Sequence, residues 1–123
     1  MITDVKEFTV KRSEWLRGEG DDDSYLYRTT DSKKCCVGFF ALACGLEQRQ
    51  IENIVSMAEL NKVIGSVYNG RFVTKTSPTT WTTSFSAAKI YAINDSEILT
   101  DQEREATLIN YFQELDIKIN FID

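Results

Sequence analysis

Three cysteines, at positions 35, 36 and 44, lie within the segment KKCCVGFFALACG and raise the question of thiol or metal chemistry. A nucleophilic thiol normally needs a base to form a thiolate, and this chain contains no histidine. Lys33 and Lys34 precede Cys35 where a helix is expected to begin, and positive charge there lowers a thiol pKa. Cysteine ligands of zinc are typically separated by about two to four residues, whereas Cys35 and Cys36 are adjacent. We expect no metal and no cofactor.

The residues around these thiols favour burial over reactivity. From Cys35 to Leu46 no residue is charged, and Cys36, Phe40 and Cys44 recur at every fourth position. A helix that is apolar on most of its faces has to be covered by the rest of the protein. We therefore expect the thiols to be structural, while a redox or enzymatic role of Cys35 stays as the alternative.

An acidic run and a tryptophan are the candidate binding residues, and no catalytic residue is assigned. Asp21, Asp22 and Asp23 are consecutive, whereas a calcium loop alternates its ligands around a central glycine. We expect a solvated loop whose carboxylates can dock against the basic residues of a partner protein. Trp81 lies in a segment rich in Ser and Thr, where it either anchors a loop to the core or projects as a binding hot spot.

Composition narrows the classes of protein that the chain can belong to. Its 123 residues fit one domain, residues 1–123, and the net charge of −5 comes without a basic stripe, so we expect no nucleic-acid partner. A membrane-spanning helix needs about 20 apolar residues, and the longest uncharged apolar run is twelve. The first ten residues lack the apolar stretch of a secretory signal. Together with the odd number of cysteines, these features favour the cytoplasm.

Several elements are expected to position these residues in the first half of the chain. Phe8 and Val10 alternate with polar neighbours and predict a short strand, and Trp15 in the following turn is expected in the core. Residues 25–30, YLYRTT, are rich in aromatic and β-branched side chains and predict another strand. The Cys-rich helix is expected to open at residue 31 or 32, to pack closely at Gly38 and to end at Gly45.

The second half begins less clearly and ends with strong signals. Short helical turns are expected after residue 46, then a hairpin at Asn69-Gly70, then an irregular, exposed Ser/Thr-rich segment. A helix over residues 85–92 is expected to end at Asn94-Asp95, with Asp95 solvated. Thr100 and Glu103 form a capping box for the next helix, and period-two alternation from residue 117 predicts a terminal strand. The expected fold is α+β: a small antiparallel sheet packed against the buried Cys-rich helix and the C-terminal helix.

Three segments together resemble a family of small proteins encoded by phages, prophages and some bacterial genomes. The segments are SEWLRGEG, CCVGFFALACGL, and IND followed by LTDQEREATLINYFQELDIKINFID. The family pattern is a Trp-containing segment, a short strand, a Cys-Cys-x-Gly helix ending in Ala-Cys-Gly, an Ile-Asn-Asp motif, an acidic helix and an aliphatic strand. The resemblance covers roughly the first 46 and the last 35 residues. It implies a genomic context rather than an activity, since most members have no assigned function.

These observations favour a non-enzymatic protein that binds another protein, such as a host or defence-system component, and modulates or inhibits it. An anti-defence, host-takeover or immunity role follows from the resemblance alone. The alternatives are a thiol-dependent enzyme or sensor that uses Cys35, a small-ligand or nucleotide-binding module with a pocket between sheet and helices, and an acidic DNA mimic.

Overall fold

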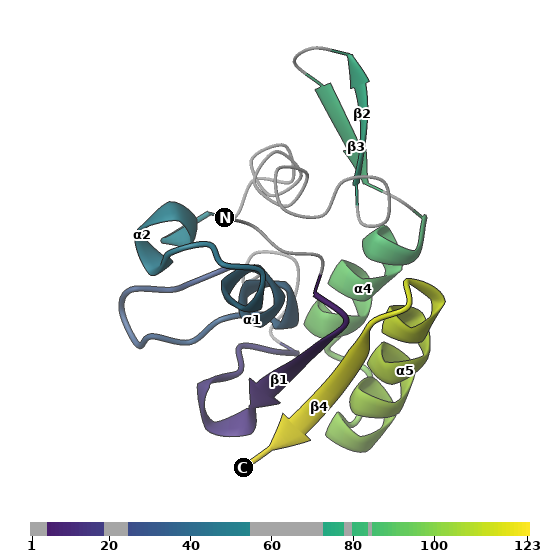
Figure 1. The fold of residues 1–123 in the computed structure, drawn as a ribbon. Coiled ribbons are helices and arrows are strands. Elements are labelled where there is room, and N and C mark those ends of the chain that lie inside the picture. Colours follow the sequence, from purple (N-terminus) through teal and green to yellow (C-terminus); the bar gives the residue numbers. More distant parts are fainter. Residues whose placement is uncertain (1–4, 19–24, 55–72, 78–79, 84) are drawn as a thin grey trace.

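The computed structural model describes residues 5–18, 25–54, 73–77, 80–83 and 85–123 (Figure 1). The elements in these ranges, in chain order, are β1 (Glu7–Lys11), the 3-10 helix η1 (Arg12–Glu14), α1 (Cys36–Ala43), α2 (Gln48–Ile51), β2 (Val73–Ser77), β3 (Thr80–Thr83), α4 (Phe85–Asp95), α5 (Asp101–Glu114) and β4 (Lys118–Ile122). The fold is α+β, as the sequence predicts. No helix in these ranges combines the length and the apolar character needed to cross a membrane.

The sheet beside the Cys-rich helix is parallel, so the predicted antiparallel arrangement is wrong. β1 pairs with β4, with Phe8 opposite Ile119 and Val10 opposite Phe121. Parallel neighbours need a crossover connection, and the helices between β1 and β4 lie within it. Hydrophobic alternation predicts which face of a strand is buried, but it is the same for both strand directions. The alternation itself is confirmed, because Phe8 and Val10 are buried between exposed neighbours.

A separate antiparallel pair, β2 and β3, occupies part of the Ser/Thr-rich segment that the sequence predicts to be irregular, so that prediction is wrong here. Lys75 lies opposite Trp81 in this pair. Threonine favours extended backbone because it is β-branched, and this preference outweighs the loop-like composition. Figure 1 shows the pair extending away from the β1–β4 sheet. The predicted hairpin turn at Asn69-Gly70 lies outside the described residues.

α1 lies in the core, which confirms the predicted buried helix. Phe40 of α1 packs against Phe8 of β1 and Phe112 of α5, with ring centroids 5.4 and 6.1 Å away. The rings of Phe8 and Phe112 are themselves 5.1 Å apart and meet edge to face. Such aromatic pairs add to the hydrophobic stabilisation of a core. One buried ring cluster therefore joins β1, α1 and α5.

The segment before α1 forms a turn, so the strand predicted over residues 25–30 is wrong. It makes only isolated bridges, one of them between Arg28 and Lys33. The backbone N–H of Arg28 donates to the carbonyl of Lys33 at 2.7 Å, and its guanidinium binds Asp31 at 2.6 Å. Because Asp31 is used inside this turn, α1 begins only at Cys36, later than the predicted start at residue 31 or 32.

Two glycines fix the position and the end of α1. A Cβ on Gly38 would overlap the carbonyl oxygen of Leu26, which confirms the predicted close packing. Gly45 has a φ of +105°, the left-handed conformation that ends a helix and that glycine adopts without steric cost, as predicted. The short helix α2 then follows, in agreement with the helical turns predicted after residue 46.

The C-terminal elements follow the prediction. α4 ends at Asp95. Thr100 Oγ1 accepts from the backbone N–H of Glu103 at 3.1 Å, and Glu103 Oε1 accepts from that of Thr100 at 2.9 Å. This reciprocal pair is the predicted capping box, and it starts α5. Ile117, just before β4, and Ile119, within it, are both buried.

Candidate functional site

The three cysteines form no disulfide, and all three side chains are buried, as the sequence predicts. Burial raises the pKa of Cys35 to about 12 and raises that of Cys36 well above its ordinary value. The ammonium of Lys34 is engaged elsewhere, 2.9 Å from Glu14 Oε1 and 4.6 Å from the ring centroid of Phe39. A thiolate at Cys35 is therefore disfavoured near neutral pH. Within the described ranges, no three His, Cys, Asp or Glu residues are grouped so that they could hold a metal ion.

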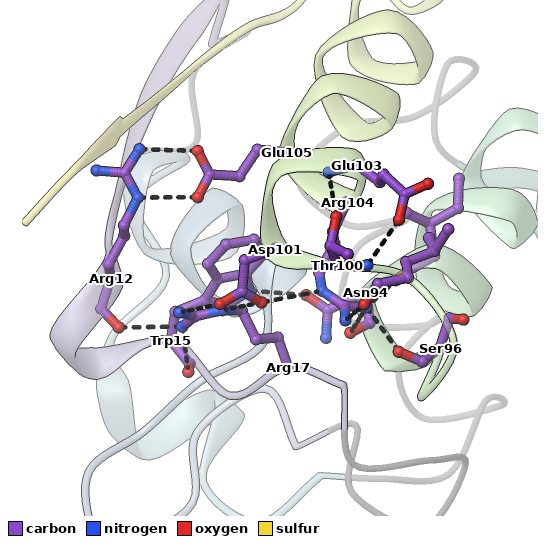
Figure 2. A network of polar contacts seen from close by, with 12 residues as sticks. Arg12, Trp15, Arg17, Asn94, Ser96, Thr100, Asp101, Glu103, Arg104 and Glu105 are labelled. Atoms are coloured by element: carbon purple, nitrogen blue, oxygen red, sulfur yellow. Dashed lines mark hydrogen bonds and ion pairs between the residues drawn. The ribbon is translucent and has the colours of Figure 1, made fainter.

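The side chain of Asn94, near the end of α4, joins three segments that are distant in sequence. Its Oδ1 accepts a hydrogen bond from Trp15 Nε1 at 2.8 Å (Figure 2). The same oxygen accepts from the backbone N–H of Cys36 at 3.0 Å. Its Nδ2 donates to the carbonyl of Leu16 and to Asp95 Oδ1, both at 3.0 Å. We call these five residues the Asn94 junction. It brings together the Trp, Cys-Cys and Ile-Asn-Asp segments noted in the sequence.

The Asn94 junction is a structural feature rather than a reactive one. The amide of Asn94 uses both acceptor positions and both donor positions, so no capacity is left for a ligand. Trp15 is 2% exposed, which confirms its predicted place in the core. Asp95 is only 7% exposed, so its predicted solvation is wrong. Its carboxylate faces the buried amide of Asn94 instead of water.

Arg104 is a buried charged residue that the sequence did not lead us to expect. It is 3% exposed, and its guanidinium donates to the carbonyls of Ile93, Ser96 and Leu99 at 2.7, 2.8 and 3.0 Å. Gly18 leaves room for this group, since a Cβ there would lie 2.9 Å from Arg104 Nη2. The guanidinium lies at the C-terminal end of α4, where a cation stabilises a helix. Its position on the apolar face of α5 was the signal that could have revealed it.

The loop between α4 and α5 presents an exposed isoleucine on a backbone held from both sides. Ile98 is 92% exposed. Its N–H donates to Ser96 Oγ at 3.3 Å, and Arg104 binds the carbonyls of Ser96 and Leu99. The capping box at Thr100 fixes the other end of the loop. A single exposed isoleucine is common on protein surfaces, but this one stands beside an apolar groove.

That groove is shallow, has a volume of about 440 Å³ and runs between α4 and α5. Its lining includes Ala92 and Ile93 of α4, Leu99 of the loop and Tyr111 of α5. We call this surface, together with Ile98, the α4–α5 groove. Apolar surface gathered in a concave region is typical of sites that bind other molecules.

A second depression, of about 420 Å³, lies between the end of α5 and the start of β4. Its lining includes Ile109 and Gln113 of α5 and, on the strand side, Lys6, Ile117 and Lys118. We call it the α5–β4 depression. Asp116 also lines it, and Lys118 Nζ lies 3.7 Å from Glu7 Oε2. The depression therefore combines apolar groups with charges of both signs, a mixture that can orient a small polar molecule.

The predicted binding residues are not placed in either surface. Asp21, Asp22 and Asp23 lie outside the described residues. Trp81 belongs to β3, and its side chain also lies outside the described part of the chain. Their roles stay predictions.

Comparisons with protein-family models, with curated proteins and with solved structures found no match to this chain.

Proposed function

We propose that this chain is a non-enzymatic protein that binds another protein and modulates or inhibits it. In this proposal it is encoded by a phage or another mobile element and acts in the cytoplasm of the host cell, in an anti-defence, host-takeover or immunity role. The origin and the location come from the resemblance and the composition of the sequence. The binding activity is supported by the α4–α5 groove.

The observation that carries the proposal is the exposure of Ile98 on a loop whose backbone is hydrogen-bonded on both sides of it. An isoleucine at 92% exposure leaves nearly its whole side chain in water. Because Arg104 and the capping box at Thr100 already fix the backbone, little conformational entropy would be lost on binding. A preorganised apolar residue beside a concave apolar surface is the arrangement of an interface hot spot.

The state of the cysteines supports a non-enzymatic role. Cys35 is the thiol that a thiol-dependent enzyme would use, and it is 1% exposed with a pKa raised to about 12. Neither access for a substrate nor a ready supply of thiolate is available there.

The experiment is affinity capture from host lysate with three forms of the protein: wild type, Ile98→Asp and Ile122→Asp. Ile122 is 51% exposed on β4, outside the lining of the α4–α5 groove, so it is a matched control for adding a charge at an exposed isoleucine. We expect a stoichiometric partner that wild type and Ile122→Asp retain and Ile98→Asp loses. A partner retained equally by all three forms would exclude this surface, and the absence of any partner would count against protein binding.

A second candidate function is a small-ligand or nucleotide-binding module, and the α5–β4 depression is the observation that favours it. Lys6 and Lys118 contribute to its lining together with Asp116, and it lies between a strand and a helix, which is where this alternative would place a pocket. A thermal-shift screen with nucleotides tests it. A ligand-induced rise in Tm that Lys118→Met removes would support this reading, and no rise with any nucleotide would count against it.

A further inference from the structure

We infer that the α4–α5 groove receives a basic amphipathic α-helix of the partner protein. This inference rests on the proposed protein-binding function and specifies the chemistry of the partner.

The shape of the groove suits a helix. α4 and α5 lie side by side, joined by a loop of only residues 96–100, as in an antiparallel helix pair (Figure 1). Lys89 and Ile93 are four residues apart on α4, and Ser96 follows just after the helix ends. Thr107 and Tyr111 face them on α5, also four residues apart. Side chains at these spacings form parallel ridges, and a third helix packs its own ridge into the furrow between them.

The apolar part of the groove is suited to the apolar stripe of that helix. Ile93, Leu99 and Tyr111 are half-buried and Ala92 is exposed, so their remaining apolar surface faces the furrow. Ile98 stands at the loop end and offers a complete side chain for contact. An amphipathic helix binds such a surface through apolar side chains repeated at three and four residues.

The charges around the groove favour a basic partner. Glu97 is exposed beside Ile98, Glu103 lies one helical turn before Thr107, and Glu114 lies near the other end of the same stripe of α5. Among the lining residues that the structure describes, Lys89 is the one cation. The pKa of Glu103 is lowered by its hydrogen bonds with Thr100, so its carboxylate keeps its charge in mildly acidic solution. Complementary charge at the rim of an interface speeds encounter and selects the partner.

A second copy of this chain fits less well. Each copy would bring the same three glutamates and a net charge of −5 to the interface. Like charges placed opposite one another oppose association. An extended peptide also fits less well, because both walls of the groove are helices, whose backbone groups are already paired along most of their length.

Three synthetic 18-residue peptides test the inference by ¹⁵N NMR titration of the full chain. The first carries leucines at helical spacing with Lys and Arg on its flanks, the second has the same leucines with Glu on its flanks, and the third is a scrambled form of the first. We expect the basic amphipathic peptide to shift the amide signals of Ala92, Ile93, Ile98 and Tyr111. It should bind at least tenfold more tightly than the other two, and its affinity should fall as salt is added.

Variants of the protein complete the test. Ile98→Asp should weaken binding of the basic peptide at least tenfold, Glu97→Lys should weaken it and reduce its salt dependence, and Ile122→Asp should leave it unchanged. Equal binding of the scrambled or acidic peptide, signal shifts elsewhere on the protein, or dimerisation through the groove in sedimentation would each overturn the inference. The lysate capture separates the two proposals. If Ile98→Asp loses a captured partner, but binding of that partner is unaffected by salt and by Glu97→Lys, the basic-helix inference fails while the proposed function stands.

Discussion

Replacing Asn94 by alanine should destabilise the protein severely, because this side chain is the common partner of three buried groups. Asn94→Ala leaves the indole N–H of Trp15, the backbone N–H of Cys36 and the carbonyl of Leu16 without their hydrogen bonds. Each buried group left unpaired costs about 1–3 kcal/mol. The three together cost about 3–9 kcal/mol, against a total free energy of unfolding of about 5–15 kcal/mol for a typical domain.

The measurement is urea unfolding followed by far-UV circular dichroism, which does not depend on the fluorescence of Trp15. Asn110→Ala is the matched control, because Asn110 is exposed on α5 and alanine is a better helix former there. We expect the control to stay within about 0.5 kcal/mol of wild type. A loss of less than about 1 kcal/mol for Asn94→Ala would refute the idea that the Asn94 junction holds the segments together.

The stability of Asn94→Asp should depend on pH. The new carboxyl keeps the acceptor oxygens but, when ionised, cannot donate to the carbonyl of Leu16 and lies beside the carboxylate of Asp95. Burial and the like charge favour its protonated form, so its pKa in the folded state is raised. The deficit of this variant relative to wild type should therefore be smallest in acid and should grow as the pH rises through that pKa.

Three further predictions concern α1, its thiols and the turn before it. Gly38→Ala should lower Tm, because overlap with the carbonyl of Leu26 costs about 1–3 kcal/mol and exceeds the helix-propensity gain of at most about 1 kcal/mol; an unchanged Tm would contradict the close packing. At pH 8, a pKa of about 12 leaves about one Cys35 thiol in 10⁴ ionised, so a thiol reagent should modify the native protein far more slowly than the urea-unfolded protein; rapid native modification would restore the thiol-dependent alternative. Arg28 lowers the pKa of Asp31 from 3.8 to about 2, so the stability that this pair provides should be complete above pH 3.8 and lost as the pH falls towards 2; acid titration of Arg28→Met should show a smaller loss, and an equal loss would count against the pair.

Local signals were sufficient to predict much of the fold. The capping box of Thr100 and Glu103 depends on residues three positions apart, and it appears where the sequence places it. The burial of α1 follows from an uncharged run that admits no exposed face. Ile117 and Ile119 begin a period-two alternation, which indicates the inner face of β4.

The candidate site was harder to predict because it depends on groups that are distant in sequence. The alternation of apolar residues in β1 and β4 carries no information about strand direction, and this is why the predicted antiparallel pairing is wrong. Arg104 reads as one more charge on an acidic helix until the carbonyls at the end of α4 are placed around it. Nothing in the sequence distinguishes Ile98 from other loop residues. Its candidate binding role follows from its exposure and from the groove beside it. Asn94 likewise gains its role from Trp15 and Cys36 together.

The pairing of β1 with β4 has a consequence for how the protein is made. Glu7 lies opposite Lys118, which the ribosome adds 111 residues later. At a synthesis rate of about 5–20 residues per second, β1 is made roughly 6–22 s before its partner strand β4. During that time Phe8 and Val10, which are buried in the folded protein, lie on a strand without its partner β4. A nascent chain interrupted before residue 118 keeps this edge of β1 unpaired. Premature termination should therefore yield fragments prone to aggregation or degradation rather than a partly working protein.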